Sequence, residues 1–221
     1  MLQGLPLVET SEMPNLSASI SDRVYLYIKK LILAGTLKGG EKIPEKKVAD
    51  LFAVSRTPVR EAIRKLAEYG LVLIKPRSCA YVATISPVEA KEISWVRLYL
   101  EKLSVRQFTE VASGDALAQL RDLSRKCKEA NQNGDYAAAH EIDSTLHLEI
   151  ARATGNGELL EMLQMLDAKL QLLRLKQHLL HTALSGYFSQ HDRLLELLEQ
   201  KDLPKIDALL EEHIMHDLNF K

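Results

Sequence analysis

The stretch VSRTPVREAIRKL, residues 54–66, decides how the N-terminal third of this chain folds. Its apolar residues recur at the three- and four-residue spacing of an amphipathic helix, so we expect a helix that starts at Ser55 and buries one face. The positions expected to face inward are Val59, Ala62, Ile63 and Leu66. The opposite, solvent-facing side carries arginines spaced four apart, at Arg56, Arg60 and Arg64.

The flanking segments supply the rest of a small domain. The expected elements are a helix from an N-cap at Ser21 to Gly35, a short helix at about 44–52, the helix from Ser55 to Gly70, and a hairpin of LVLI (71–74) and CAYVATI (79–85) around the turn KPRS (75–78). Three helices followed by a hairpin predict a winged helix-turn-helix domain with a two-stranded wing over residues 19–85. Residues 1–18 lack periodicity and predict a flexible arm.

The rest of the chain, residues 86–221, has no strand pattern. It opens on a helix start signal, with Ser86 as N-cap, Pro87 at the first position and Glu89 to close a capping box. Helical periodicity then continues in six segments, at roughly 87–112, 115–132, 135–153, 157–180, 184–199 and 203–219. The fold class expected is therefore mainly α, with a C-terminal all-α bundle of six helices, or seven as the alternative.

Composition excludes several classes of protein. The 221 residues have no apolar run long enough to span a membrane and no signal peptide pattern, which predicts a cytoplasmic protein without membrane partners. The two cysteines, Cys79 and Cys127, lack CxxC spacing and argue against a disulfide framework or a cysteine-rich zinc site. We find no HExxH, Gly-rich phosphate loop or GxSxG motif, so we expect no enzyme.

Charge is divided unevenly along the chain. Residues 21–82 hold 13 Lys and Arg against 6 Asp and Glu, a net charge of +7, whereas residues 83–221 carry −6. A basic unit joined to an acidic one predicts that only the first binds a polyanion. A helix that offers Arg from its first turns suits the DNA major groove, with Ser55 and Thr57 placed for phosphate. The alternative is that these charges only solvate an exposed face.

The segment 24–82 resembles the DNA-binding domain of GntR-type bacterial transcription regulators. The match is carried by LILAGTLKGGEKI, VADLFAVSRTPVREAIRKLAEYGLV and KPRSCAYV, although Ala53 stands where the family usually has Gly. The resemblance implies that Lys46, Arg56 and Arg60 contact operator DNA, with Thr57 on the backbone and Arg77 of the wing in the minor groove. It also implies a homodimer on a palindromic operator, usually as a repressor.

The stretch DSTLH, residues 143–147, places a carboxylate and an imidazole one helical turn apart. Asp143 and His147 together could provide two metal ligands, but such a pair is more often an ordinary exposed helix face. Four other histidines are rivals for any such site, with a solvent-exposed or capping role as the alternative: His140, His178, His181 and His216. Arg97 and Arg174, each within an apolar helix, are candidates for binding a ligand carboxylate, with structural salt bridges as the alternative.

Residues 97–213 are similar to the FCD ligand-sensing domain of the FadR subgroup of GntR regulators. The motifs that carry this are Arg97 with Glu101, DSTLH at 143–147, ATGN at 153–156, His191 and His213, and a count of six helices favours the VanR-like type. The resemblance implies that Asp143, His147, His191 and His213 bind one divalent metal ion, for which zinc, nickel and manganese are suitable. The function expected is a ligand-responsive regulator with a small carboxylate effector; a fatty-acyl effector is less favoured. The alternative is a metal-dependent hydrolase or binding module tethered to a basic domain.

Overall fold

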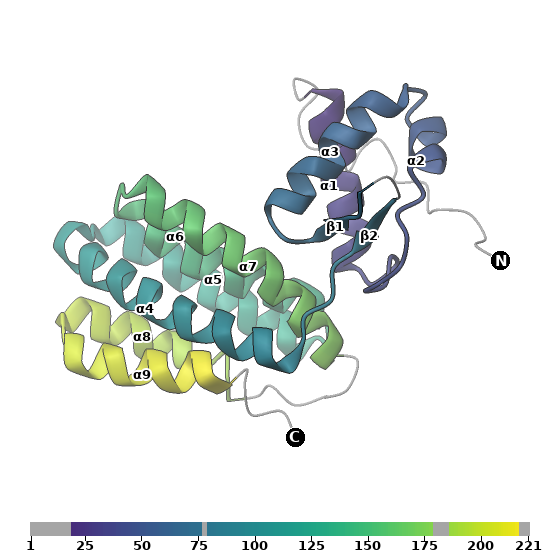
Figure 1. Cartoon of the computed structure of the whole chain (residues 1–221). Helices are drawn as coiled ribbons and strands as arrows, with labels where there is room; N and C mark the ends of the chain where they lie inside the picture. Colours follow the sequence, from purple (N-terminus) through teal and green to yellow (C-terminus); the bar gives the residue numbers. More distant parts are fainter. Residues whose placement is uncertain (1–18, 77–78, 179–185, 217–221) are drawn as a thin grey trace. The chain divides into compact units, whose positions relative to one another are not determined.

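A computed structural model of the chain describes residues 19–76, 79–178 and 186–216. The chain divides into two compact units between Thr84 and Ile85. Within the described residues, the first unit contains three helices and a two-stranded sheet, and the second contains six helices (Figure 1). The predicted fold class is confirmed, whereas the predicted arm at 1–18 lies outside the described residues.

The first unit is held together by the apolar faces of α1 and α3. Its helices are α1 (Ile20–Leu33), α2 (Glu45–Leu51) and α3 (Arg56–Glu68). The four α3 positions predicted to face inward are all buried, α1 and α3 pack against each other, and Val24, Ile28, Leu31 and Ile32 of α1 are buried as well. The N-cap of α1 was predicted wrongly: Ser19, not Ser21, accepts the hydrogen bond from the Asp22 N–H at 3.1 Å, which satisfies an otherwise unpaired donor of the first turn.

The turn and the wing complete this unit. Ala53, between α2 and α3, has a φ of +53°, in the left-handed region that favours glycine. The wing consists of β1 (Val72–Ile74) and β2 (Ala80–Val82), paired antiparallel with Leu73 opposite Tyr81. The second strand is shorter than the predicted 79–85, although the Ala83 N–H still donates to the carbonyl of Leu71 at 2.9 Å, in register with the pairing of Val72 and Val82.

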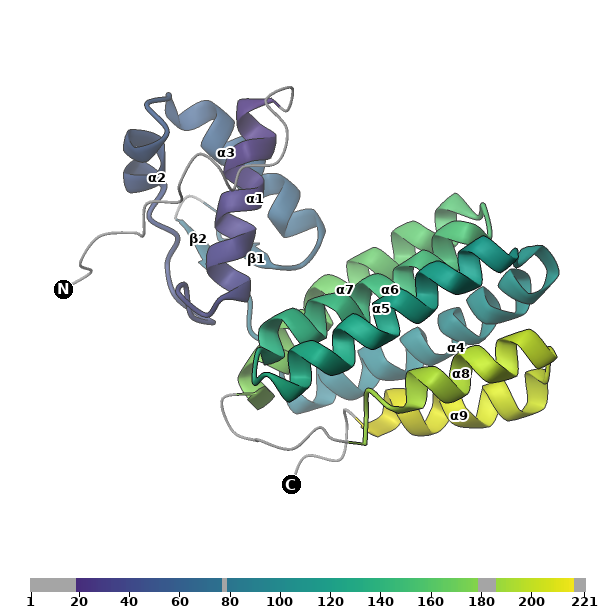
Figure 2. The ribbon, with the colours of Figure 1, turned by 180° about the vertical axis from the view of Figure 1, so that it is seen from behind.

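The second unit is a closed bundle. Its helices are α4 (Pro87–Val111), α5 (Gly114–Gln132), α6 (Tyr136–Ala153), α7 (Gly157–His178), α8 (Gln190–Gln200) and α9 (Leu203–His216). Each packs against the next around a ring in the order α4, α7, α6, α5, α8, α9 and back to α4 (Figure 2). Side chains that point inward from several helices therefore meet in one interior.

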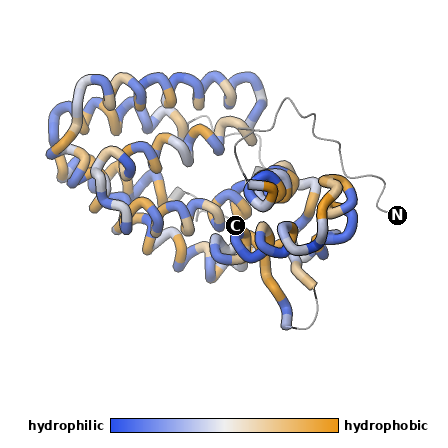
Figure 3. The backbone as a smooth tube through the Cα atoms, turned by 90° about the horizontal axis from the view of Figure 1, so that it is seen from above, coloured by the Kyte–Doolittle hydropathy of each residue, from blue (hydrophilic) through white to orange (hydrophobic). Residues whose placement is uncertain are grey.

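Local sequence signals explain most of the helix ends. Ser86 caps α4 by accepting from the Glu89 N–H at 3.1 Å, while the Glu89 carboxylate contacts Lys169 of α7. The start of α8 differs from the predicted 184, because Tyr187 and Phe188 lie in a turn with both rings buried in the bundle. Hydrophilic and hydrophobic positions alternate along the helices as an amphipathic bundle requires (Figure 3). Among the described helices, none combines the length and apolarity that a membrane crossing needs.

Candidate functional site

The exposed face of α3 and its neighbours carries the residues predicted to contact DNA. Lys46 on α2, and Ser55, Arg56, Thr57 and Arg60 at the start of α3, are all exposed. The Ser55 side chain makes no capping hydrogen bond with its helix. Arg77 lies outside the described residues. The first turns of α3 thus present cationic and hydroxyl groups to solvent, as insertion into a major groove requires.

One ion pair crosses this face. The Nε of Arg60 lies 3.2 Å from Oε2 of Glu45 on α2, and the Arg60 side chain is 61% exposed. An exposed pair of this kind contributes little to stability, so Arg60 can exchange this partner for a phosphate or a base edge at small cost.

The second unit buries a cluster of three histidines and one aspartate. Asp143 and His147 come from α6, His191 from α8 and His213 from α9, and all four are buried. One potential ligand atom from each of the four lies within 4.8 Å of those of the others. Nε2 of His191 lies 2.9 Å from Oδ1 of Asp143, and Nε2 of His147 lies 3.2 Å from Nε2 of His213. The structure therefore brings together the whole predicted ligand set.

Two further polar side chains determine the tautomers of two histidines. Nδ1 of His147 lies 2.5 Å from Oε2 of Glu101 on α4, and because a carboxylate only accepts, this contact favours the tautomer with the proton on Nδ1. Nδ1 of His213 lies 2.9 Å from Oε1 of Gln190, whose amide nitrogen donates to Glu212 at 3.0 Å. Because the Gln190 oxygen faces His213, that Nδ1 is also a donor. Both Nε2 atoms then hold a lone pair.

This arrangement suits a metal ion better than a hydrogen-bond network. Two Nε2 lone pairs that face each other at 3.2 Å repel unless a cation lies between them. His191 Nε2 and Oδ1 of Asp143 are buried and make no hydrogen bond of acceptable geometry within the described residues, whereas Oδ2 of Asp143 is ion-paired with Arg174. Three imidazole nitrogens and a carboxylate oxygen match the donors that zinc and related divalent ions prefer. The residues present therefore fit a bound metal.

Arg174 of α7 holds the aspartate in its charged form. Its guanidinium lies 2.7 Å from Oδ2 of Asp143 and donates to the Tyr187 hydroxyl at 3.0 Å and to the Ser144 hydroxyl at 3.2 Å. Burial by itself would raise the pKa of the Asp143 carboxyl, but Arg174 and the histidines outweigh burial and hold this pKa well below its usual range. Asp143 thus stays an anion, with Oδ1 turned to the histidines.

Burial also keeps two imidazoles neutral. It lowers the pKa of His213 well below the ordinary value, and the neighbouring histidines lower it further. Burial lowers the pKa of His191 as well, although Asp143 partly opposes the shift. Neutral imidazole is the form that binds a metal.

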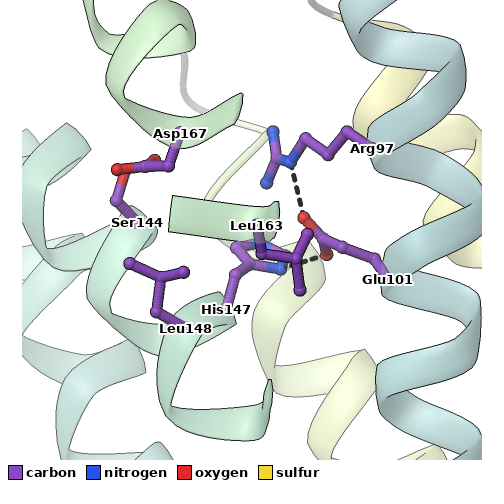
Figure 4. Close-up of a pocket in the computed structure, with 7 residues that line it drawn as sticks. All are labelled: Arg97, Glu101, Ser144, His147, Leu148, Leu163 and Asp167. Carbon is purple, nitrogen blue, oxygen red and sulfur yellow. Dashed lines mark hydrogen bonds and ion pairs between the residues drawn. The ribbon is translucent and has the colours of Figure 1, made fainter. Parts of the chain in front are cut away.

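Beside the cluster lies a narrow pocket with room for about one water molecule. Its lining residues come from α4, α6 and α7 and are Arg97, Glu101, Ser144, His147, Leu148, Leu163 and Asp167 (Figure 4). The Nε of Arg97 donates to Oε1 of Glu101 at 2.5 Å, and this charge holds the pKa of Glu101 at about 2 despite the opposing effect of burial. Of the two arginines predicted for an effector, Arg97 lines the pocket, whereas the guanidinium of Arg174 is engaged by Asp143.

The sequence reasoning missed four residues of this site. Ser144 and Asp167 line the pocket, Gln190 orients His213, and the Tyr187 ring stacks on His213 with centroids 4.1 Å apart. Ser144, Gln190 and Tyr187 are close in sequence to Asp143 or His191, and this proximity is the only sequence signal for them. Nothing in the sequence points to Asp167. The rival His140 packs against Phe188 and does not belong to the cluster. His181 and the side chains of His178 and His216 lie outside the described part.

Comparison with known proteins agrees with this architecture. Residues 20–82 match the family described as bacterial regulatory proteins, gntR family, and residues 92–216 match the FCD domain. The matched segments correspond to the two units, and the FCD match covers more than half of the chain. The resemblance to GntR regulators with an FCD domain is confirmed, and placement in the FadR subgroup is consistent with it.

Individual relatives cover most of the chain. The HTH-type transcriptional regulator YdhC of Bacillus subtilis is 26% identical over 194 residues, which span 87% of each protein. The HTH-type transcriptional repressor RspR of Escherichia coli is 24% identical over 207 residues, 94% of this chain and 90% of that protein. The solved structure of McbR/YncC from E. coli has a similar fold, with a TM-score of 0.81 and 24% identity over 91% of this chain and 96% of that one.

These relatives are transcription regulators and not enzymes, which confirms the expectation that the chain is not an enzyme. The chain belongs to the GntR family of bacterial regulatory proteins, in the group that carries an FCD domain, and it is a DNA-binding transcriptional regulator.

Proposed function

We propose that this regulator is a homodimeric, metal-containing repressor in the cytoplasm, which binds a palindromic operator and responds to a small carboxylate. The observation that carries the sensing part is the buried cluster of Asp143 and three histidines beside a pocket lined by Arg97. The repressor role is supported by the name of the E. coli relative RspR.

The metal would be a zinc, nickel or manganese ion, bound by Asp143, His147, His191 and His213. When bound, such an ion supplies positive charge and open coordination positions that can hold an anion. The residues of the chain do the rest: Glu101 and Gln190 orient two of the imidazoles, and Arg174 keeps Asp143 charged.

The effector would bind on the side of the cluster that the pocket opens to. Arg97 offers a guanidinium there, a planar donor suited to a carboxylate. The side chains of the cluster and the pocket come from several helices, among them α4, α6, α8 and α9. An anion bound between these side chains can therefore shift the helices relative to one another. An effector that binds one helix arrangement more tightly than the other shifts the protein towards that arrangement. The change in the protein's affinity for the operator is limited by the difference between the effector's affinities for the two arrangements.

Dimerisation is supported by an exposed apolar face on α4. Five large apolar residues that are one third or more exposed share this face, which we call the α4 stripe: Val88, Trp95, Val96, Tyr99 and Leu103. Contiguous apolar surface of this kind marks interaction sites. A second copy of the chain is the occupant we infer, because a single helix-turn-helix reads only half of a two-fold operator.

The test is a gel-shift titration with the chain's own promoter DNA, before and after removal of metal with a chelator. We expect a sequence-specific shift that weakens as salt rises, and a metal-loaded protein whose affinity changes with added carboxylates. The metal itself is measured on untreated protein by elemental analysis and native mass spectrometry, with a His191→Ala variant as the control.

Two outcomes would contradict separate parts of this proposal. A protein that binds no DNA specifically at any concentration would refute the operator role. Operator binding that responds equally well to carboxylates in metal-free and metal-loaded protein would refute the metal site as a sensor, while leaving DNA recognition intact.

A further inference from the structure

Asp167 of α7 is an acidic residue that lines the pocket beside the cluster, and the family resemblance assigns it no role. Its Oδ1 accepts from the Ser144 hydroxyl at 2.5 Å, and its Oδ2 accepts from the Gln171 amide at 2.8 Å. No ion pair to this carboxylate occurs within the described residues, unlike Glu101 across the pocket, which is paired with Arg97. A carboxylate with spare acceptor capacity that faces a ligand pocket can accept a further hydrogen bond from a ligand.

The charges around the site limit the charge of the ligand. The guanidinium groups of Arg97 and Arg174 oppose the carboxylates of Asp143, Glu101 and Asp167, which leaves one negative charge in excess. A divalent ion reverses this to one positive charge in excess. A ligand with a single carboxylate then makes the site neutral, whereas a dicarboxylate would bring a second negative charge close to the half-buried Asp167, where the two like charges repel.

The void is smaller than any of these ligands. It has room for about one water molecule, or for one hydroxyl group of a ligand. Leu148 and Leu163 form its apolar lining (Figure 4), so larger ligands must displace one of these side chains.

We propose that Asp167 selects the effector class: a hydroxy monocarboxylate, whose carboxylate binds on the side of the metal and Arg97 and whose hydroxyl donates to Asp167. This inference rests on the proposed carboxylate-sensing function and narrows it to hydroxy acids and sugar acids. Dicarboxylates are rejected by like charge, and simple fatty acids offer no further donor to the Asp167 carboxylate.

The test is calorimetric titration of the metal-loaded full chain with four probes: lactate, gluconate, propionate and malate. For the wild-type chain we expect lactate or gluconate to bind about 10- to 100-fold more tightly than propionate, since the hydrogen bond involves a charged acceptor, and malate to bind weakly. In Asp167→Asn the preference for the hydroxyl should fall to less than about threefold, and malate affinity should rise. The amide can keep the bond from Ser144, so the fold is retained. Glu161→Gln, an exposed acid on the same helix, is the control for net charge.

The possible failures are distinct. If carboxylates bind the wild-type chain but Asp167→Asn keeps the same preferences, the role of Asp167 is overturned and the proposed carboxylate sensing stands. If none of the four probes binds the metal-loaded wild-type chain, the effector part of the proposed function fails together with this inference. Alanine, which carries an ammonium in place of the hydroxyl of lactate, is the fifth probe; tighter binding of alanine than of lactate would overturn the choice of a hydroxyl.

Discussion

At the scale of single residues, the site depends on which nitrogen of each histidine carries the proton. Glu101 and Gln190 lie outside the cluster of four, yet they turn the lone pairs of His147 and His213 to a common point. A histidine without such a partner can adopt the other tautomer or rotate, and it then loses metal affinity.

We therefore expect Glu101→Gln to weaken metal binding by about 10- to 100-fold, because an amide orients the His147 ring less strongly than a carboxylate does. Competition against a chromogenic chelator measures this affinity. The matched control is Glu92→Gln, an exposed acid on the same helix α4, which should bind metal as the wild type does. Equal affinities for the two variants would show that Glu101 has no orienting role.

At the scale of elements, the α2–α3 pair is the part that we propose reads DNA. Its apolar face is buried against α1, so the exposed arginines are carried on a rigid helix. Rigid placement matters because bidentate recognition of a base tolerates little movement.

For this helix we predict that Arg56→Ala lowers operator affinity about 10- to 100-fold and relaxes specificity at one base pair of each half-site. Fluorescence anisotropy with wild-type and singly substituted operators measures both effects. Lys65→Ala removes the same charge near the C-terminal end of α3, where Lys65 pairs with Asp22, and should weaken binding far less. Equal losses in both variants would indicate that α3 contributes only its overall charge.

The turn that joins α2 to α3 carries a local strain. Ala53 occupies the left-handed region at a φ of +53°, which costs a residue with a Cβ about 1–2 kcal/mol, whereas glycine loses about 0.5–1 kcal/mol through its greater freedom when unfolded. Ala53→Gly should therefore stabilise the first unit by roughly 0.5–1 kcal/mol. Slower hydrogen exchange in α2 and α3 of the full chain would reveal the gain. Ala53→Val should speed the exchange, and the reverse order would argue against strain at this turn.

At the scale of the whole molecule, we propose that the α4 stripe links effector sensing to DNA recognition by forming the dimer interface. Helix α4 carries the stripe on its exposed face and Arg97 and Glu101 on its buried face, so one helix serves both the pocket and the proposed interface. If an effector displaced α4, both the pocket and the proposed dimer interface would change.

We predict that Trp95→Asp produces a monomer, because the charge would be buried unpaired in the interface. Light scattering after size exclusion measures the mass, and the affinity for the full palindrome should fall towards that for a half-site. Ala118→Asp, at an exposed position on α5, introduces the same charge elsewhere and should leave the mass unchanged. A dimeric Trp95→Asp protein would place the interface on another surface.

The sequence by itself determined the winged helix-turn-helix and the all-α second unit, because helix periodicity and caps are local signals that neighbouring residues carry. Asp143 and His147 share a helix face through their spacing alone, and the family resemblance named His191 and His213 as their partners. Only the tertiary structure decided that those four meet, that Arg174 is occupied by Asp143, and that Asp167 and Tyr187 belong to the site. It also decided that α8 begins at Gln190, since burial of two aromatic rings overrode the local helical pattern. The physical reason is common to all of these: contacts between residues far apart in sequence depend on how helices pack, and no local pattern encodes that packing.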